Sequence, residues 1–387
     1  MTIYVQCCLK KLKLDDCDCF TRSSPKKGKQ LSFASSLFVS NSLQQKIIPS
    51  FLVHSFLKLK TIKVSIVLPF KNAALYLTEC IESICAQSHQ DWELIAIDDH
   101  STDQSRTVVE GFQDPRIAVY DNEGEGILPA LRSAQKYIAG DFVTRMDADD
   151  IMPPHKFETL LGILLSEQKG TVATGKVQYF SESEITFGYQ EYENWLNKTA
   201  SENSFYKQIY RECVVASPNW MMHRSDFDAM EGFTRLQYPE DYDMVFQWRK
   251  KGFVIKACDA CTHLWREHSH RTSRNSDVYQ QESFFRLKLV YFLEEFQGQN
   301  LYLIGTEQKG VLIAKMLQSQ NVSFRWFAQD PALIGKKKRE VELENITALP
   351  QNGICILSVY PKDKAREELI KFMTNLTYVI GETAHFF

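Results

Sequence analysis

The sequence has no run of about eighteen apolar residues, the length that a membrane-spanning helix requires. Residues 31–56 are only intermittently apolar because Ser, Asn, Gln and Pro interrupt them, and they lack the continuous hydrophobic run and the cleavage site of a signal peptide. The ten cysteines are scattered and do not form a disulfide framework. We therefore predict a cytoplasmic protein with reduced thiols.

The main body of the chain has fewer positive than negative charges. The first 60 residues hold ten Lys or Arg against three Asp, a net charge of +7, so that residues 61–387 carry −10 of the total of −3. This balance argues against a nucleic-acid partner. Three hypotheses stay open for residues 1–60: a disordered basic tail, a peripheral contact with the inner face of the cell membrane through Lys and Phe side chains, or sequence upstream of the true start.

Strands and helices alternate from about residue 61. Buried strands are predicted at residues 64–69, 92–97, 117–120 and 142–146, with helices at 74–87, 106–112 and 127–138 between them. Such alternation favours right-handed βαβ units and a parallel sheet, whose strands end at the edge where α/β folds bind ligands. We predict an α/β domain over residues 61–297, with polar residues 69–72, 98–99 and 147–149 at that edge.

Two acids follow the strand at residues 142–146. Because side chains alternate along an extended segment, Asp147 and Asp149 point to the same side while Ala148 points away. Two convergent carboxylates suit Mg²⁺ or Mn²⁺ bound to a diphosphate. The alternative is that Asp149 or Asp150 caps a following helix and holds no metal.

Residues 239–252 have the features of one helix, with Pro before its start, acids in the first turn, bases in the last turn and Gly as the stop. Asp241 shares a face of this helix with Met244, Val245 and Trp248. An acid on an inward face is either a cap for backbone amides or a general base that takes a proton from a hydroxyl group. The residues alone leave both interpretations open.

Taken together, these segments resemble the family 2 glycosyltransferases, which have the GT-A nucleotide-sugar fold. The resemblance covers about residues 62–275 and is carried by residues 64–72 (VSIVLPFKN), 98–103 (DDHSTD), 139–150 (AGDFVTRMDADD) and 239–243 (PEDYD). An ordered set of segments is more specific than any one motif. It implies a GT-A mixed or parallel sheet flanked by helices, and a nucleoside diphosphate sugar, UDP-linked, as the donor.

The resemblance also implies roles for matching residues on the donor side. The residues that it implies as contacts of the nucleotide sugar are Pro69, Asn72, Asp98, Asp99 and Asp147, with Pro69 and Asp99 at the uracil. The departures from the family pattern are His100, where Gly is usual, and Arg132, where Asn is common, which would alter a turn and a donor contact respectively.

Metal and catalytic roles follow in the same way. Asp147 and Asp149 would hold the Mn²⁺ or Mg²⁺ cofactor and His268 would complete its shell, while Arg266 lies near the diphosphate. Asp241 would be the base, and Glu240 would orient the helix or bind the acceptor.

Two features of the second half have rival interpretations. Trp220 could stack on an acceptor sugar, although an aromatic residue in this position is more often part of the core. Cys258, Cys261 and His263 could bind zinc, but the spacing lacks a second pair of ligands, and residues 253–261 are typical of a strand.

Residues 298–387 are predicted to form a smaller Rossmann-like α/β domain. The turn at residues 305–310 lacks the middle Gly of the dinucleotide fingerprint, and its Glu307 would repel a pyrophosphate. We therefore favour docking, regulation or homo-oligomer formation over nicotinamide binding as its role.

The sequence as a whole predicts an inverting, metal-dependent glycosyltransferase that transfers a sugar to a hydroxyl of a glycan or lipid-linked acceptor in polysaccharide biosynthesis. The alternatives are a nucleotidyltransferase, which would release pyrophosphate, and a noncatalytic sugar-nucleotide or glycan-binding module. A further alternative is a bifunctional protein with a redox C-terminal domain.

Overall fold

The structure is a computed structural model that describes residues 62–269, 271 and 276–387. The chain divides into two units, Met1–Leu57 and Lys58–Phe387, and all of the described residues belong to the second. The predictions made for residues 1–60 lie outside the described residues. None of the helices in the described ranges combines the length and the apolar character needed to cross a bilayer.

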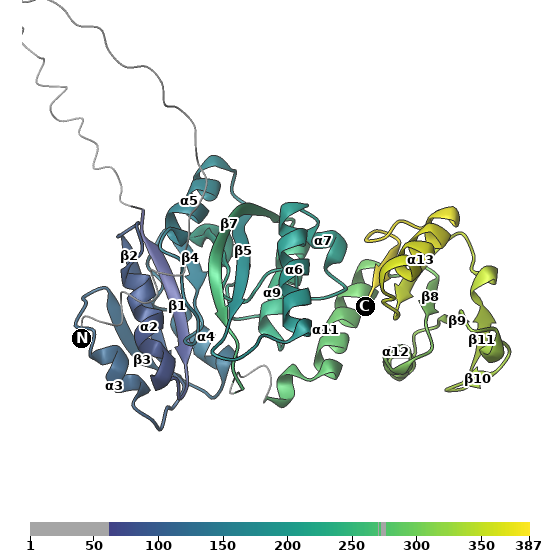
Figure 1. Ribbon diagram of the computed structural model, residues 1–387, viewed down its shortest axis with the longest axis horizontal. Helices are drawn as coiled ribbons and strands as arrows, with labels where there is room; N and C mark the ends of the chain where they lie inside the picture. The colour runs from purple at the N-terminus through teal and green to yellow at the C-terminus, as the bar shows by residue number, and fades with distance from the viewer. Residues whose placement is uncertain (1–61, 270, 272–275) are drawn as a thin grey trace, which may run out of the picture. The chain divides into compact units, whose positions relative to one another are not determined.

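The first sheet has seven strands in the order β3-β2-β1-β4-β6-β5-β7 (Figure 1). Only β6 is antiparallel to its neighbours, β4 and β5, so that the sheet is mixed. The predicted strands are all present, and the strand predicted at residues 253–261 continues to Arg266. The bounds are β1 Val64–Phe70, β2 Trp92–Asp98, β3 Ile117–Asp121, β4 Phe142–Arg145, β5 Thr171–Phe180, β6 Trp220–His223 and β7 Val254–Arg266.

Helices cover both faces of this sheet. Along β1, Val64, Ile66 and Leu68 pack in the hydrophobic cluster that contains α2 and α5, whereas Val67 packs in the cluster that contains α4 and α9. Burial on both faces explains why β1 is apolar throughout. The helices are α2 Ala74–Cys85, α3 Ser105–Glu110, α4 Ile127–Gln135, α5 Lys156–Ser166, α6 Phe187–Ser201, α7 Phe205–Gln208, α8 Arg224–Ala229, α9 Glu240–Lys250 and α11 Gln281–Glu295.

The second sheet, green to yellow in Figure 1, has the order β10-β11-β9-β8-β12-β13. Five of its strands are parallel, and in chain order they run 3-2-1-4-5, as in a Rossmann-type sheet. The domain boundary near residue 298 stays a prediction. The bounds are β8 Leu301–Ile304, α12 Gln308–Ser319, β9 Arg325–Ala328, β10 Lys337–Lys338, β11 Val341–Asn345, β12 Ile354–Leu357, α13 Asp363–Asn375 and β13 Ala384–Phe386.

The C-terminal part shares its core with the first part of the unit. One hydrophobic cluster contains residues of α9, α11, β8 and α12. The ring of Phe387 stacks on Tyr210 with centroids 5.5 Å apart, and the guanidinium of Arg211 lies 4.0 Å from the centroid of the Tyr360 ring. The beginning of α12 is thereby placed beside α11, next to the cavity described below.

Candidate active site

A cavity of about 620 Å³ opens at the carboxyl ends of β1, β2 and β4. In the parallel register Phe70 pairs with Asp98 and Val67 with Arg145, so that the loops following these strands emerge at one edge. The structure brings most of the predicted site residues to this cavity. They are Pro69, Asn72, Asp99, Asp147, Asp149, Glu240, Asp241 and His268.

Asp99 lies at one end of the cavity and is held by its own hydrogen bonds. Its carboxylate accepts the backbone N–H of Gly126 at 2.9 Å and the side-chain amide of Asn122 at 2.6 Å, and it lies 3.3 Å from the ammonium of Lys71. These contacts fix the direction of a carboxylate that is 5% exposed. Asp99 can therefore present an oriented acceptor to a ligand N–H.

Asp98 has a different role from its neighbour. Its Oδ1 accepts the backbone N–H of Ser101 at 2.9 Å, and its Oδ2 lies 3.5 Å from Arg106. It does not line the cavity. Asn72 does line the cavity, but its Oδ1 accepts the N–H of Thr102 at 2.7 Å, so its side chain also braces the loop after β2.

Asp147 and Asp149 both line the cavity, and each has a partner. They lie beyond the end of β4 at Arg145, and Ala148 lines the cavity as well, so alternation along a strand does not explain their position. Asp147 Oδ1 lies 2.9 Å from Arg145 Nε, and Asp149 Oδ2 lies 2.8 Å from His268 Nε2. Burial raises the pKa of Asp147 despite the nearby Arg145. Burial acts the same way on Asp149, but the hydrogen bond with His268 and the positive charge of Arg271 together outweigh it and hold the pKa of Asp149 below its usual value. Asp149 is therefore ionised at neutral pH.

Asp150 is structural and does not cap a helix. It is 1% exposed, accepts the backbone N–H of Arg266 at 2.8 Å, and lies 2.9 Å from Nε2 of the fully buried His263. The following helix, α5, begins at Lys156 without a side-chain cap, so the capping alternative is wrong. Because Arg266 Nε also donates to the carbonyl of Asp149 at 2.8 Å, the turn that carries Asp149 is held in place.

The donor set at this end suits a hard divalent cation. Within the described ranges, no three His, Cys, Asp or Glu side chains form a ready-made metal cluster, at Cys258, Cys261 and His263 or elsewhere. Mg²⁺ and Mn²⁺ are often held by only one or two carboxylates together with substrate phosphates. Five carboxylates and three basic side chains line this part of the cavity, which gives an excess of two negative charges when all are ionised. The carboxylates are Asp99, Asp147, Asp149, Glu240 and Asp241, and the bases are Lys71, Arg145 and Arg271.

Asp241 lies at the start of α9 and faces the cavity. It is half-buried, and its Oδ1 accepts the backbone N–H of Tyr242 at 2.7 Å. Burial, and then the charge of Glu240, raise the pKa of Asp241 to about 7. A carboxylate that titrates near neutral pH can take a proton from a hydroxyl group and release it again.

Arg145 connects the two acidic groups and is the residue that sequence reasoning missed. It is 5% exposed, and its guanidinium lies 2.9 Å from Asp147 and 3.0 Å from Glu240 Oε1. Glu240 also accepts the hydroxyl of Tyr279 at 2.6 Å. The available signal was the alternation itself, because an Arg two residues before Asp147 in an apolar strand must share its side.

Comparison with known proteins decides the family. The family profile described as Glycosyl transferase family 2 matches residues 65–230. A Bacillus subtilis glycosyltransferase named for teichuronic acid biosynthesis, TuaG, is 33% identical over 215 residues, which are 55% of this chain and 82% of that protein. The chain belongs to glycosyltransferase family 2.

Other relatives match over shorter spans. The glycosyltransferase GlyG of Streptococcus pneumoniae is 34% identical over 127 residues, 32% of this chain and 42% of that protein. WfgD of Escherichia coli is 28% identical over 169 residues, 42% of this chain and 60% of that protein. The chain thus spans less than two thirds of the length of these two relatives. The structure of Staphylococcus aureus TarS residues 1–349 with UDP-GlcNAc is 17% identical, with a TM-score of 0.46, over 66% of this chain and 72% of that chain.

His100 stands where family members usually have Gly. The structure shows its backbone at φ +57°, in the left-handed region that glycine enters without a steric penalty. Its Nε2 lies 2.8 Å from the carbonyl oxygen of Gly124. His100 therefore holds a left-handed turn, and its side-chain contact offsets part of the backbone strain.

Besides Asp98, three residues expected at the site lie outside the cavity. Trp220 is 2% exposed and packs edge-to-face on Trp248 with centroids 5.9 Å apart, so it is a core residue and cannot stack on an acceptor. The guanidinium of Arg132 donates a hydrogen bond to the carbonyl oxygen of Leu236 at 2.7 Å, which fixes the loop before α9. Arg132 is therefore not a contact for the donor sugar.

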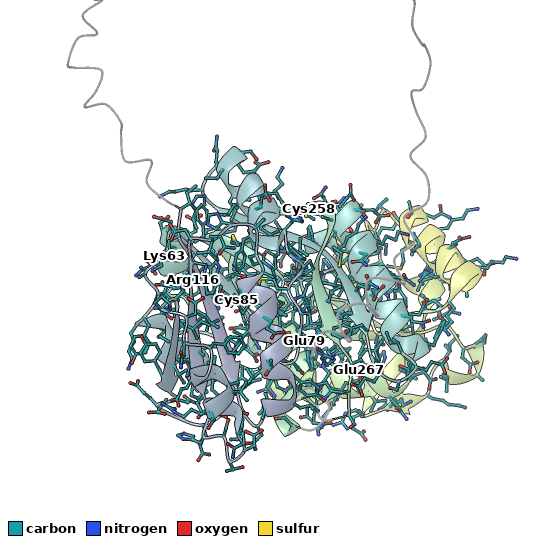
Figure 2. The ribbon with its side chains drawn as sticks, turned by 60° about the vertical axis from the view of Figure 1, so that its left-hand side comes forward. Lys63, Glu79, Cys85, Arg116, Cys258 and Glu267 are labelled. Atoms are coloured by element: carbon teal, nitrogen blue, oxygen red, sulfur yellow. The ribbon has the colours of Figure 1, made fainter. Side chains whose placement is uncertain are left out.

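Arg266 is the third of these residues. It forms an ion pair with Glu79 of α2. Figure 2 labels Glu79 and also Glu267, the residue that follows Arg266. Its guanidinium lies over the Phe180 ring, 4.4 Å from the centroid. Arg271 lines the cavity, so it is Arg271 that can reach a ligand there.

Proposed function

We propose that this protein is a metal-dependent, inverting glycosyltransferase that moves a sugar from a UDP-linked donor to a hydroxyl of a glycan or lipid-linked acceptor. The observation that carries the proposal is the position of Asp241. A carboxylate with a pKa of about 7 shares one cavity with Asp99 at one end and with Asp147 and Asp149 beside it. Nucleotide, metal and base roles can therefore be filled within a single site.

The relatives support a role in surface glycan assembly. WfgD is named as a UDP-Glc:alpha-D-GlcNAc-diphosphoundecaprenol beta-1,3-glucosyltransferase, and TuaG is named for teichuronic acid biosynthesis. A UDP-sugar donor and a polysaccharide or lipid-linked acceptor for this chain are consistent with both names.

The donor would bind along the acidic end of the cavity. Pro69 and the oriented carboxylate of Asp99 would receive the uracil, and Asp147, Asp149 and His268 would hold Mn²⁺ or Mg²⁺. When bound, the divalent cation offsets the charge that builds on the leaving diphosphate. Arg145 keeps Asp147 and Glu240 in place by contacting both.

Asp241 would act on the acceptor. The acceptor oxygen attacks the anomeric carbon from the face opposite the diphosphate, and its proton passes to the carboxylate of Asp241. The bond between the anomeric carbon and the diphosphate oxygen breaks, and its electron pair leaves with UDP. One displacement of this kind inverts the configuration at the anomeric carbon.

Titration of the protein with UDP, GDP, CDP and dTDP, each with and without Mn²⁺, tests the donor assignment, because a bound ligand stabilises the folded state by mass action. We expect a thermal shift that is selective for UDP and depends on Mn²⁺. An absence of any shift would sink the proposal. Detection of released UDP, and not pyrophosphate, with an acceptor present separates transfer from nucleotidyl transfer and from binding alone.

A further inference from the structure

The cavity has a second end with a different chemistry. Helix α11 contributes Phe284, Phe285 and Lys288, and α12 of the C-terminal part contributes Lys309. The ammonium nitrogens of Lys288 and Lys309 lie 4.8 Å and 5.9 Å from the centroid of the same Phe285 ring. Two cations from distant parts of the chain therefore meet at one aromatic side chain.

Neither lysine has a carboxylate bonded to it among the residues that the structure describes. Lys288 is 3% exposed and donates one hydrogen bond, to the carbonyl of Arg211 at 2.9 Å, which leaves two of its three N–H donors. Burial lowers the pKa of Lys288 to about 8, with Glu212 opposing and Lys309 adding to this effect. Lys288 is thus still mostly charged at neutral pH, and Glu212, which also lines the cavity, offsets only one of the two positive charges of Lys288 and Lys309.

The charged groups near this end differ from those near Asp241. The groups that act on Asp241 are Glu240, Arg145 and Asp147, whereas those that act on Lys288 are Glu212 and Lys309. Cys213 lines the same cavity, and both Asp241 and Glu212 raise its pKa. The proposed function assigns the donor diphosphate to Asp147 and Asp149, which leaves the lysines for the acceptor.

We propose that Lys288 and Lys309 form a subsite for a phosphate group carried by the acceptor, with Phe284 and Phe285 covering the apolar part next to that phosphate. A phosphate with close to two negative charges matches two ammonium groups better than a carboxylate does. The inference rests on the proposed function. It also gives the C-terminal part a role, because α12 supplies one of the two cations.

The test uses octyl phosphate as the probe, on the full chain saturated with UDP and Mn²⁺ so that the donor site is filled. Octyl glucoside, which has the same tail without a charge, and octanoate, which carries a carboxylate, are the comparison ligands. Isothermal titration is carried out on the unaltered protein, Lys309→Ala, Lys309→Glu and a control, Lys315→Ala. Lys315 lies on the same helix, is exposed, and does not line the cavity.

We expect octyl phosphate to bind more tightly than the other two ligands. We expect Lys309→Ala to weaken it about fivefold, the size of a partly exposed ion pair, and Lys309→Glu to weaken it further. UDP affinity should stay unchanged in both variants, and Lys315→Ala should behave as the unaltered protein. Because Lys309 is exposed, these variants should fold.

The other outcomes overturn the inference in distinguishable ways. If UDP binds normally but octyl phosphate shows no preference or no dependence on Lys309, the subsite is wrong and the proposed function stands. If octanoate binds as tightly as octyl phosphate, the phosphate assignment is wrong. If UDP affinity falls in the Lys309 variants, the lysines hold the donor diphosphate. If UDP does not bind the unaltered protein, the proposed function fails and the inference fails with it.

Discussion

Replacing Asp241 by Asn tests the central catalytic assignment with little change of shape. The amide keeps the size of the side chain and an oxygen that can accept the N–H of Tyr242, but it cannot take a proton at neutral pH. A positioned general base contributes about 10² to 10⁴ in rate. We therefore expect kcat for sugar transfer to fall by about that factor, while Mn²⁺-dependent UDP affinity stays within about twofold, since Asp241 is not a donor ligand.

The same substitution has a stability signature that is independent of catalysis. The folded state raises the pKa of Asp241 from 3.8 to about 7, so between these values the folded state binds a proton that the unfolded state has released. The stability from this group is complete below about pH 4 and is lost as the pH rises through 7. Since Asp241 is only half-buried and coupled to Glu240, we take the loss as on the order of 2 kcal/mol.

Thermal denaturation at pH 5 and pH 8 measures this effect. We expect the Tm of Asp241→Asn to exceed that of the unaltered protein by a few degrees at pH 8. The difference in Tm between the two proteins should be smaller at pH 5. The transfer rate of the unaltered protein should rise with pH through about 7, as the base loses its proton. Full turnover by Asp241→Asn, or a Tm difference that does not depend on pH, would refute the reasoning. Asp243→Asn is the control for turnover, because Asp243 lies on the same helix but does not line the cavity.

Three further predictions concern neighbouring residues. Asp149→Ala should weaken Mn²⁺-dependent UDP binding by at least about tenfold in titration calorimetry, whereas Asp98→Asn, outside the cavity, should weaken it much less; equal losses would remove Asp149 as a metal ligand. Arg145→Met should leave Asp147 and Glu240 unpaired and lower the free energy of unfolding by about 3 kcal/mol in urea titrations, an effect that a purely surface role would not produce. His100→Gly should relieve the left-handed backbone but lose the contact with Gly124, so we expect the free energy of unfolding to change by less than about 1 kcal/mol; a larger loss would show that the imidazole contact holds the turn.

The local pattern of apolar residues was sufficient to predict much of the fold. The apolar runs of β1, β2 and β4 and the helices between them follow from periodicity, because their side chains are buried on both faces of the sheet. Helical spacing placed Asp241 with the inward residues of α9, whereas Asp147 and Asp149 lie beyond the end of β4, where alternation along the strand no longer applies. Boundaries were less secure, as in α4, which ends at Gln135 and not at residue 138.

The partners of those residues depended on tertiary structure. The adjacent acids Asp98 and Asp99 differ in role, because Asp98 accepts the backbone N–H of Ser101 whereas Asp99 accepts that of Gly126. Nothing in the dipeptide itself distinguishes them. Trp220 enters the core because Trp248, from a helix 28 positions later, packs against it.

Residues that are far apart in the sequence meet at the cavity and give its two ends their charges. Arg145 joins Asp147 to Glu240, which is 95 residues away in the chain. Lys309 reaches the cavity only because α12 packs beside α11. Periodicity in the sequence determines which face a side chain takes. The packing of distant elements determines how deeply it is buried and which other charges lie near it, and with them the pKa of Asp241 and the chemistry of the second end of the cavity.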